Sequence, residues 1–195
     1  MNYLKMTVAT LALTAGIAFS TQSCSSMMGN KSMDMDKTVM VGGAAMYPTK
    51  NIVENAVNSK DHTTLVAAVK AAGLVETLSS KGPFTVFAPT NEAFDKLPAG
   101  TVDTVLKPEN KAMLTSVLTY HVVPGKISSK DLASWIMKGN GSYMAKTVQG
   151  EELTFTMSGK NIYVADMKGN KAMVTIADVN QSNGVIHVID KVLMP

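Results

Sequence analysis

The sequence predicts an α+β domain, because two kinds of hydrophobic pattern occupy different parts of the chain. Across much of the stretch from 51 to 138, apolar residues recur every three or four positions, as on one face of an amphipathic helix. Between 153 and 189, short runs rich in β-branched and aromatic residues alternate with turn residues. Helices early in a chain and antiparallel strands late are typical of α+β domains.

The first helices are indicated by their apolar spacing and by their ends. Ile52 and Val57 fit a short helix, and the apolar residues from 65 to 72 fit a second. Asp61 is a suitable N-cap for the second helix, and Gly73 can end it. Phe84 to Phe87 then favours a short strand.

Three further helices follow in the first two thirds of the chain. Pro89 ends the short strand, and the hydroxyl of Thr90 can cap a helix that carries Ala93, Phe94 and Leu97. Pro108-Glu109 places a proline and an acid in the first turn of the next helix. Its apolar face consists of Met113, Leu114, Val117 and Leu118. Ser128 and Asp131 predict a capping box for a helix through Leu132 and Ile136.

The last third of the chain predicts an antiparallel meander. Four β-rich runs lie at 153–157, 162–165, 173–176 and 185–189. Turn residues separate them at 158–160, 168–170 and 182–184. The stretch from about residue 47 onward is of a usual single-domain size, and a domain of about 150 residues buries roughly 68 to 70% of its unfolded surface.

The N-terminus has the layout of an export signal over residues 1–23. Lys5 precedes an apolar run from Val8 to Phe19, which is shorter than the roughly 20 residues that span a bilayer. Small residues then precede Cys24, the only cysteine, as a lipoprotein signal peptidase requires. We therefore expect lipid on Cys24; the alternative is ordinary secretory cleavage near residues 18–20. With one cysteine, an exported domain holds no internal disulfide.

Residues 24–46 favour a flexible tether, because they mix polar residues and glycine without a helical or strand period. The segment is rich in methionine, at positions 27, 28, 33, 35, 40 and 46. Thioethers are soft ligands suited to Cu(I). The residues leave both a copper-binding tether and a plain spacer open.

Charge excludes one class of partner. The chain has 18 basic residues, all of them lysine, against 15 acidic ones. Arginine supplies the bidentate contacts most used for phosphate and guanine, and no lysine block with interleaved aromatic residues occurs. Nucleic acid is therefore not an expected partner.

Three stretches carry a family resemblance. The first is Thr85 to Phe94, the second is Tyr120-His121, and the third is the closing run from Asn183 to Pro195. Together they resemble the signature stretches of the fasciclin-like adhesion domain. The resemblance covers 47–195 and implies a wedge formed by a twisted β-sandwich flanked by short helices. It also implies structural roles for Thr85, Phe87, Pro89, Thr90, Asn91, Phe94, Gly184, His187 and Asp190.

The chemistry of these residues favours structural work at most positions. Thr90 and Asn91 can bond the free amides at a helix start, and Phe87 and Phe94 can anchor the two sides of the corner. His187 lies in a strand that is apolar on both faces, where a histidine is usually a hydrogen-bonded core residue.

Tyr120 and His121 are the candidates for binding a partner. A phenol and an imidazole just after a helix can form an exposed polar contact, and the resemblance implies receptor engagement through this pair. The alternative is structural: Val122-Val123 follows at once, and the imidazole can tie neighbouring loops together.

No catalytic, metal or cofactor motif is present in the sequence. A Gly-x-Ser-x-Gly elbow and a phosphate-binding glycine loop are both missing, and the three histidines are far apart. A Ser/His/Asp site assembled by folding is left open through Asp61, Asp178 and Asp190. We expect no enzyme activity.

The expected function is therefore binding at a cell envelope. The resemblance implies adhesion to a cell-surface or matrix protein or to a polysaccharide, with the chain held at a bacterial membrane by lipid on Cys24, facing the periplasm or the surface. The alternative is a periplasmic carrier of a lipid-like small molecule, and a structural envelope protein is a third possibility.

Overall fold

The computed structural model describes residues 38–97 and 100–195. The helices are α1 (Ile52–Ala56), α2 (Thr63–Ala72), α3 (Val75–Ser79), α4 (Asn91–Asp95), α5 (Thr101–Leu106), α6 (Lys111–Tyr120) and α7 (Ser129–Lys138), with 3-10 turns η2 (Lys60–His62) and η3 (Pro108–Asn110). The strands are β1 (Val39–Val41), β2 (Ala44–Met46), β3 (Phe84–Pro89), β4 (Val122–Pro124), β5 (Ser142–Lys146), β6 (Glu152–Ser158), β7 (Asn161–Ala165), β8 (Lys171–Gln181) and β9 (Gly184–Ile189). The predicted α+β class is confirmed.

A seven-stranded sheet in the order β4-β3-β9-β8-β7-β6-β5 forms the centre of the fold. The late meander from β5 to β9 is antiparallel throughout, as the sequence predicts. The pairing of β3 with β9 is parallel, and it places Phe84 opposite Gly184 and Pro89 opposite Ile189. The first and last signature stretches are therefore neighbours in the sheet.

The sheet bends strongly at β8. The first residues of β8 pair with β7, whereas the part from Val174 to Gln181 pairs with β9 across two register shifts. Bulges of this kind bend a strand and increase its twist. At the far edges, Val148 N donates to the carbonyl of Val122 at 2.8 Å, which links the end of β5 to β4. The result is one twisted, nearly closed sheet, which forms the wedge that the resemblance implies as a twisted β-sandwich.

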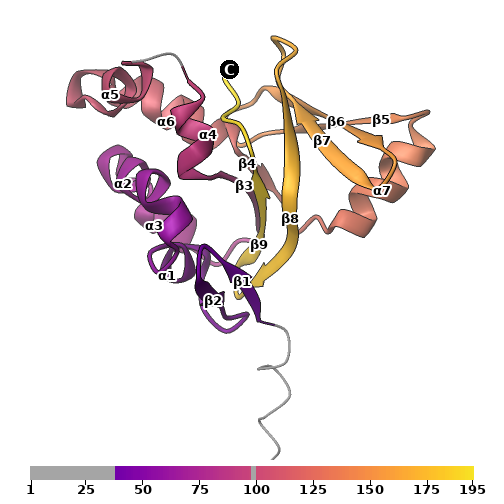
Figure 1. Ribbon diagram of the computed structural model, residues 1–195, viewed down its shortest axis with the longest axis horizontal. Helices are drawn as coiled ribbons and strands as arrows, with labels where there is room; N and C mark the ends of the chain where they lie inside the picture. Colours follow the sequence, from indigo (N-terminus) through magenta and orange to yellow (C-terminus); the bar gives the residue numbers. More distant parts are fainter. Residues whose placement is uncertain (1–37, 98–99) are drawn as a thin grey trace, which may run out of the picture. The chain divides into compact units, whose positions relative to one another are not determined.

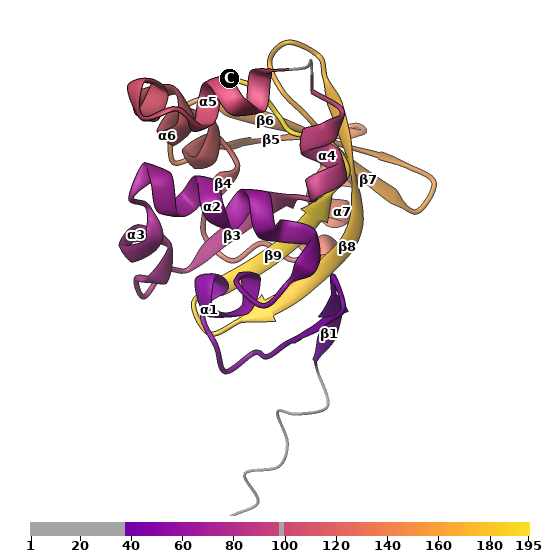
Figure 2. The ribbon, with the colours of Figure 1, turned by 60° about the vertical axis from the view of Figure 1, so that its left-hand side comes forward.

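Helices cover the two sides of β3 and β9 unequally. Figure 1 shows α1 to α6 on one side of these strands and α7 on the other, against β5 and β6. Val86 and Ile186 pack against the larger helical layer, whose α2 runs across β3 and β9 in Figure 2. Phe87 and Ile189 lie in the second core, under α7. Phe87 has no exposed surface, and burial of such a side chain contributes about 1.5–3 kcal/mol.

Local end signals are confirmed at three helices. Ser128 and Asp131 form the expected capping box of α7, and the Thr90 hydroxyl accepts from Ala93 N at 3.3 Å at the start of α4. Gly73 ends α2 in the left-handed conformation, with φ of 75°. The cap predicted at Asp61 is wrong: Asp61 lies inside η2, and His62 stands at the N-cap of α2 without a side-chain bond.

The structure also corrects the expected tether at its C-terminal end. Residues 39–46 form a hairpin of β1 and β2, in which Val41 and Met46 are 2% exposed. Both belong to the helix-side core, which is the core that also contains Val86 and Ile186. Gly42 and Gly43 make the turn with φ of 57° and 74°. A Gly-Gly pair is a known hairpin signal, so the sequence contained this information. The folded part therefore begins before Tyr47; the rest of the expected tether and residues 1–23 lie outside the described residues.

Four other helices and strands were not expected from the sequence: α3, α5, β4 and β5. Each is short, and β4 is defined by its pairing with β3 rather than by its own pattern. Within the described ranges, no helix is long and apolar enough to cross a membrane.

Candidate functional site

The hydroxyl of Thr85 holds the loop between β4 and α7. Its Oγ1 donates to the carbonyl of Gly125 at 2.7 Å and accepts from Ile127 N at 2.9 Å. Thr85 has no exposed surface, so both bonds form away from water. A buried hydroxyl that both donates and accepts a hydrogen bond stabilises the fold, because water cannot reach it to replace either bond and the loss of one costs free energy.

His187 holds the same loop from the neighbouring strand. Its Nε2 donates to the carbonyl of Ile127 at 2.9 Å, and its Nδ1 accepts from Asp178 N at 3.3 Å. The ring is stacked on Phe87 and fully buried. Burial lowers the pKa of His187, and the Ile127 carbonyl opposes that effect. The position of His187 agrees with the core role that the sequence favoured.

Asp178 completes this network at the β8 bulge. It has a φ of 58°, a conformation that aspartate tolerates better than most residues. Its carboxylate accepts from Ser129 N at 2.7 Å and from the Ser129 hydroxyl. Asp178 thereby fixes the start of α7 to β8.

Folding thus brings Ser129, Asp178 and His187 together, but without the geometry of a catalytic triad. The imidazole contacts Asp178 through the backbone amide, and both of its nitrogens are bonded to backbone groups. A triad needs the imidazole between the hydroxyl and the carboxylate. Asp190 is also engaged structurally, since its Oδ1 accepts from Met173 N at 2.7 Å.

The structure corrects the expectation that Tyr120 and His121 face a partner. Tyr120 is 0% exposed and His121 is 3% exposed. The Tyr120 hydroxyl donates to the carbonyl of Glu152 at 3.2 Å and accepts from Met167 N at 3.3 Å. Burial raises the pKa of Tyr120. The pair supports the fold, which is the structural alternative that the residues left open.

His121 fastens the C-terminal segment. Its Nδ1 donates to the carbonyl of Val117 at 2.8 Å, and its Nε2 accepts from Leu193 N at 3.0 Å. Burial lowers the pKa of His121 to about 4, although the Val117 carbonyl and Asp166 favour the charged form. Next to this bond, Asp166 Oδ2 accepts from Met194 N at 3.2 Å.

Asn91 and Asn183 make long-range hydrogen bonds that the sequence did not predict. Asn91 was expected to bond the start of its own helix, but its Oδ1 accepts from Thr64 N at 3.1 Å and so satisfies a free amide of α2. Asn183 accepts from Ile52 N at 3.0 Å and donates to Leu78 O at 2.7 Å and Ser80 O at 2.9 Å. These bonds tie α1 and α3 to the β8–β9 turn. The sequence indicates only that Asn183 belongs to a turn.

Gly184, Pro89 and Phe94 are also placed within the packed fold. A Cβ at Gly184 would clash with the carbonyl of Phe84, because β3 and β9 approach closely there. Pro89 is the last residue of β3, and Phe94 is half-buried against the helix-side core.

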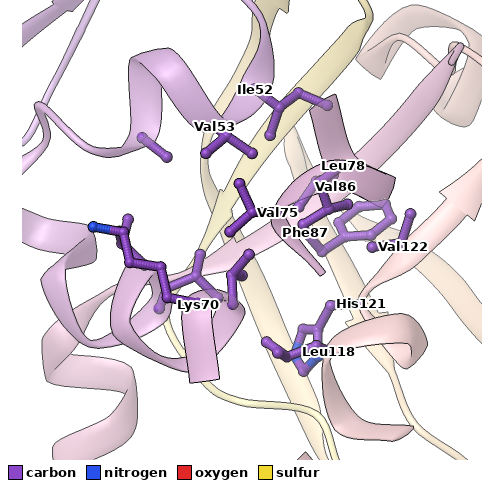
Figure 3. A pocket seen from close by; sticks show the side chains of 14 residues that line it. Ile52, Val53, Lys70, Val75, Leu78, Val86, Phe87, Leu118, His121 and Val122 are labelled. Atoms are coloured by element: carbon purple, nitrogen blue, oxygen red, sulfur yellow. The ribbon is translucent and has the colours of Figure 1, made fainter. Parts of the chain in front are cut away.

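Two apolar pockets are lined mainly by the helical layer. The first is bounded by α1, α2, α3, β3 and α6; Figure 3 shows Val53, Val75 and Phe87 around it, with the nitrogen of Lys70 turned away. The second lies between α2, α5, α6 and the C-terminal segment, and His121 contributes to the walls of both. Water-sized molecules can occupy about 40 Å³ in the first and about 30 Å³ in the second. Both pockets are therefore almost filled by side chains.

Within residues 38–97 and 100–195, no group of three or more histidine, cysteine, aspartate or glutamate side chains could hold a metal ion. Of the methionines considered for Cu(I), Met40 is 60% exposed and Met46 is buried, and the other four lie outside the described residues. Cys24 also lies outside them.

Comparison with known proteins decides the family. The family model described as "Fasciclin domain" matches residues 60–195. This chain belongs to the fasciclin domain family. Protein sll1483 of Synechocystis sp. is 52% identical over 160 residues, which are 82% of each chain. The cell surface glycolipoprotein MPB83 of Mycobacterium bovis is 37% identical over 160 residues, covering 80% of this chain and 64% of that protein.

The fold comparison agrees. The solved structure of a FAS1 domain pair from the insect cell adhesion molecule fasciclin I has a TM-score of 0.67 and 19% identity, over 76% of this chain and 52% of that one. In this fasciclin domain the first and last signature stretches meet in the parallel β3–β9 pair. The second stretch, Tyr120-His121, contacts the first, because Phe87 N donates to the His121 carbonyl at 2.9 Å. The likeness to sll1483 spans more residues than 60–195, so it includes part of the chain before the family match.

Proposed function

We propose that this fasciclin domain is a non-enzymatic binding module of the cell envelope. It is exported through residues 1–23, carries lipid on Cys24, and binds a cell-surface or matrix protein or polysaccharide. Two similar proteins support this proposal: MPB83 is a cell surface glycolipoprotein, and fasciclin I is a cell adhesion molecule.

One observation carries the proposal. The polar signature residues are used up in internal bonds: Thr85 and His187 hold the loop at 125–127, His121 holds Leu193, and Asp190 holds Met173. An enzyme site needs reactive groups that converge on a space open to substrate. Binding through the outer surface is the function that such a scaffold supports best.

Location and lipid attachment are tested in cells. Radiolabelled palmitate should enter the protein, and Cys24→Ser should abolish the label while the protein is still exported. A membrane-impermeant amine reagent applied to intact cells then labels the exposed lysines of a surface-facing protein. If the reagent labels the protein only after the outer layer is opened, cell-to-cell adhesion is excluded.

Adhesion itself is tested with beads that carry the chain at high density. Weak single-domain contacts add up when many copies share a surface, so beads should bind cells or matrix even where the monomer binds weakly. Beads coated with heat-unfolded chain serve as the control. Equal capture by both bead types would contradict a folded binding surface.

The apolar pockets support a second candidate, a carrier of a lipid-like molecule. Their walls are almost entirely apolar, as in small-molecule sites, but such sites usually have about 300–1,000 Å³. The helices would have to move outward to admit a ligand. Native mass spectrometry of gently purified protein distinguishes the candidates, since a carrier retains a lipid-sized mass.

A further inference from the structure

We propose that a groove lined by three lysines binds an acidic polysaccharide, one whose sugars carry carboxylate groups. The lysine groove lies between the end of α4, the β7–β8 turn and the C-terminal segment, and it presents Lys96, Lys168 and Lys191. Figure 1 shows these three segments at the same end of the sheet, with the C-terminus beside α4. This inference rests on the proposed binding function and names its partner class.

The lysine groove has room for a ligand. Its volume is about 490 Å³, whereas the two apolar pockets offer about 40 and 30 Å³. Small-molecule and saccharide units are usually held in spaces of about 300–1,000 Å³. The groove can therefore take a sugar unit without any movement of the helices.

The described lining of the groove is positively charged. Among the residues that the structure describes, no acidic one lines it. Two carboxylates close in sequence to Lys168 and Lys191 accept from backbone amides: Asp190 accepts from Met173 N, and Asp166 accepts from Lys168 N at 3.0 Å and Asn170 N at 2.8 Å. Asp95, which precedes Lys96, is exposed to solvent. Lys96 Nζ donates to the carbonyl of Asp190 at 3.0 Å, which fixes one ammonium group at the rim. Three cations around one concave space attract a polyanion.

The uncharged part of the lining favours a sugar over other anions. Thr101 and Asn170 offer a hydroxyl and an amide that can bond sugar hydroxyls. Leu97, Val192 and Met194 provide apolar surface for the C–H face of a ring. A free inorganic anion would use neither feature. Single-stranded nucleic acid would need aromatic platforms, and the described part of the lining contains no aromatic residue.

The competing partner is an anionic membrane surface. Met167 is 72% exposed beside Lys168, and an apolar side chain next to a lysine can enter a lipid headgroup layer. A membrane is flat, however, and would leave the concave groove and its hydrogen-bonding groups unused. The polysaccharide is therefore the occupant that the lining supports.

The test uses the full chain with Cys24→Ser, so that lipid does not interfere, and polygalacturonate as the probe. Isothermal titration should show binding that weakens as salt is added, and neutral dextran should not bind. Lys168→Gln/Lys191→Gln should lower the affinity about tenfold, since about 1.4 kcal/mol of lost charge interaction is a factor of ten. Both side chains are exposed, so the melting temperature should not change.

A matched variant separates a site from general attraction. Lys130 and Lys160 line another pocket, between α7 and the β6–β7 hairpin, so Lys130→Gln/Lys160→Gln removes the same charge elsewhere. It should lower the affinity less than about twofold. Equal losses in both double variants, or no binding of polygalacturonate at all, would overturn the proposal.

Three further outcomes keep this inference distinct from adhesion in general. Binding to phosphatidylglycerol vesicles in place of polygalacturonate, with loss in Met167→Ser, would assign the groove to a membrane and overturn the polysaccharide. If coated beads bind cells but the chain does not bind polygalacturonate, the adhesion proposal stands and the lysine-groove proposal fails. If the beads bind neither cells nor matrix but polygalacturonate binds the groove, the adhesion proposal fails and the lysine-groove proposal stands.

Discussion

Protonation of His121 should make this domain sensitive to mild acid. The neutral ring donates from Nδ1 to the Val117 carbonyl and accepts at Nε2 from Leu193 N. A second proton on Nε2 would point at the Leu193 amide hydrogen, so protonation breaks the bond that fastens the C-terminal segment. Burial accordingly lowers the pKa of His121 from 6.5 to about 4.

The sign and size of the effect follow from this difference. Because the folded-state pKa lies below the unfolded value, the unfolded chain binds more protons between them. The contribution of His121 is complete above about pH 6.5, falls as the pH drops, and is fully lost below about pH 4. Linkage gives a loss of about 2 kcal/mol between pH 7 and pH 5, and about 3 kcal/mol in total.

Urea unfolding at a series of pH values measures this loss, and His121→Gln isolates it. Glutamine does not titrate, and its amide oxygen can accept near the position of Nε2. The variant should be less stable at pH 7 but should lack about 2 kcal/mol of the acid-induced loss. Burial also lowers the pKa of His62 and His187, so some acid sensitivity should persist in the variant. Identical pH profiles for the two proteins would refute the reasoning.

Three other substitutions test the long-range contacts by chemical unfolding. Gly184→Ala should destabilise the domain by about 1–3 kcal/mol, because the new methyl group overlaps the Phe84 carbonyl and separates β3 from β9; an unchanged midpoint would contradict that close approach. Asn183→Ala removes three hydrogen bonds and should cost about 3 kcal/mol, whereas a cost below about 1 kcal/mol would mean that water replaces them. Thr85→Val should cost about 1–3 kcal/mol and speed amide hydrogen exchange in the loop at 125–127, with exchange in α2 as the internal control.

Family membership and the division into early helices and a late meander could be predicted, because both depend on short-range patterns. The functional assignment of Tyr120 and His121 could not. Their sequence shows two polar side chains after a helix, and only the packing of β6, the β7–β8 turn and the C-terminal segment around them makes them internal. The lysine groove was equally out of reach, since Lys96, Lys168 and Lys191 are far apart in the chain.

The sequence by itself determined the features that a few neighbouring residues control: the capping box at Ser128, the stop at Gly73 and the turns of the meander. Their free energy comes from bonds within one turn of chain, so the local residues suffice. Tertiary structure alone decided the parallel pairing of β3 with β9, the bond from Asn91 to α2 and the burial of Tyr120 and His121. These contacts join segments that are far apart in the chain, and their stability depends on the whole core forming at once.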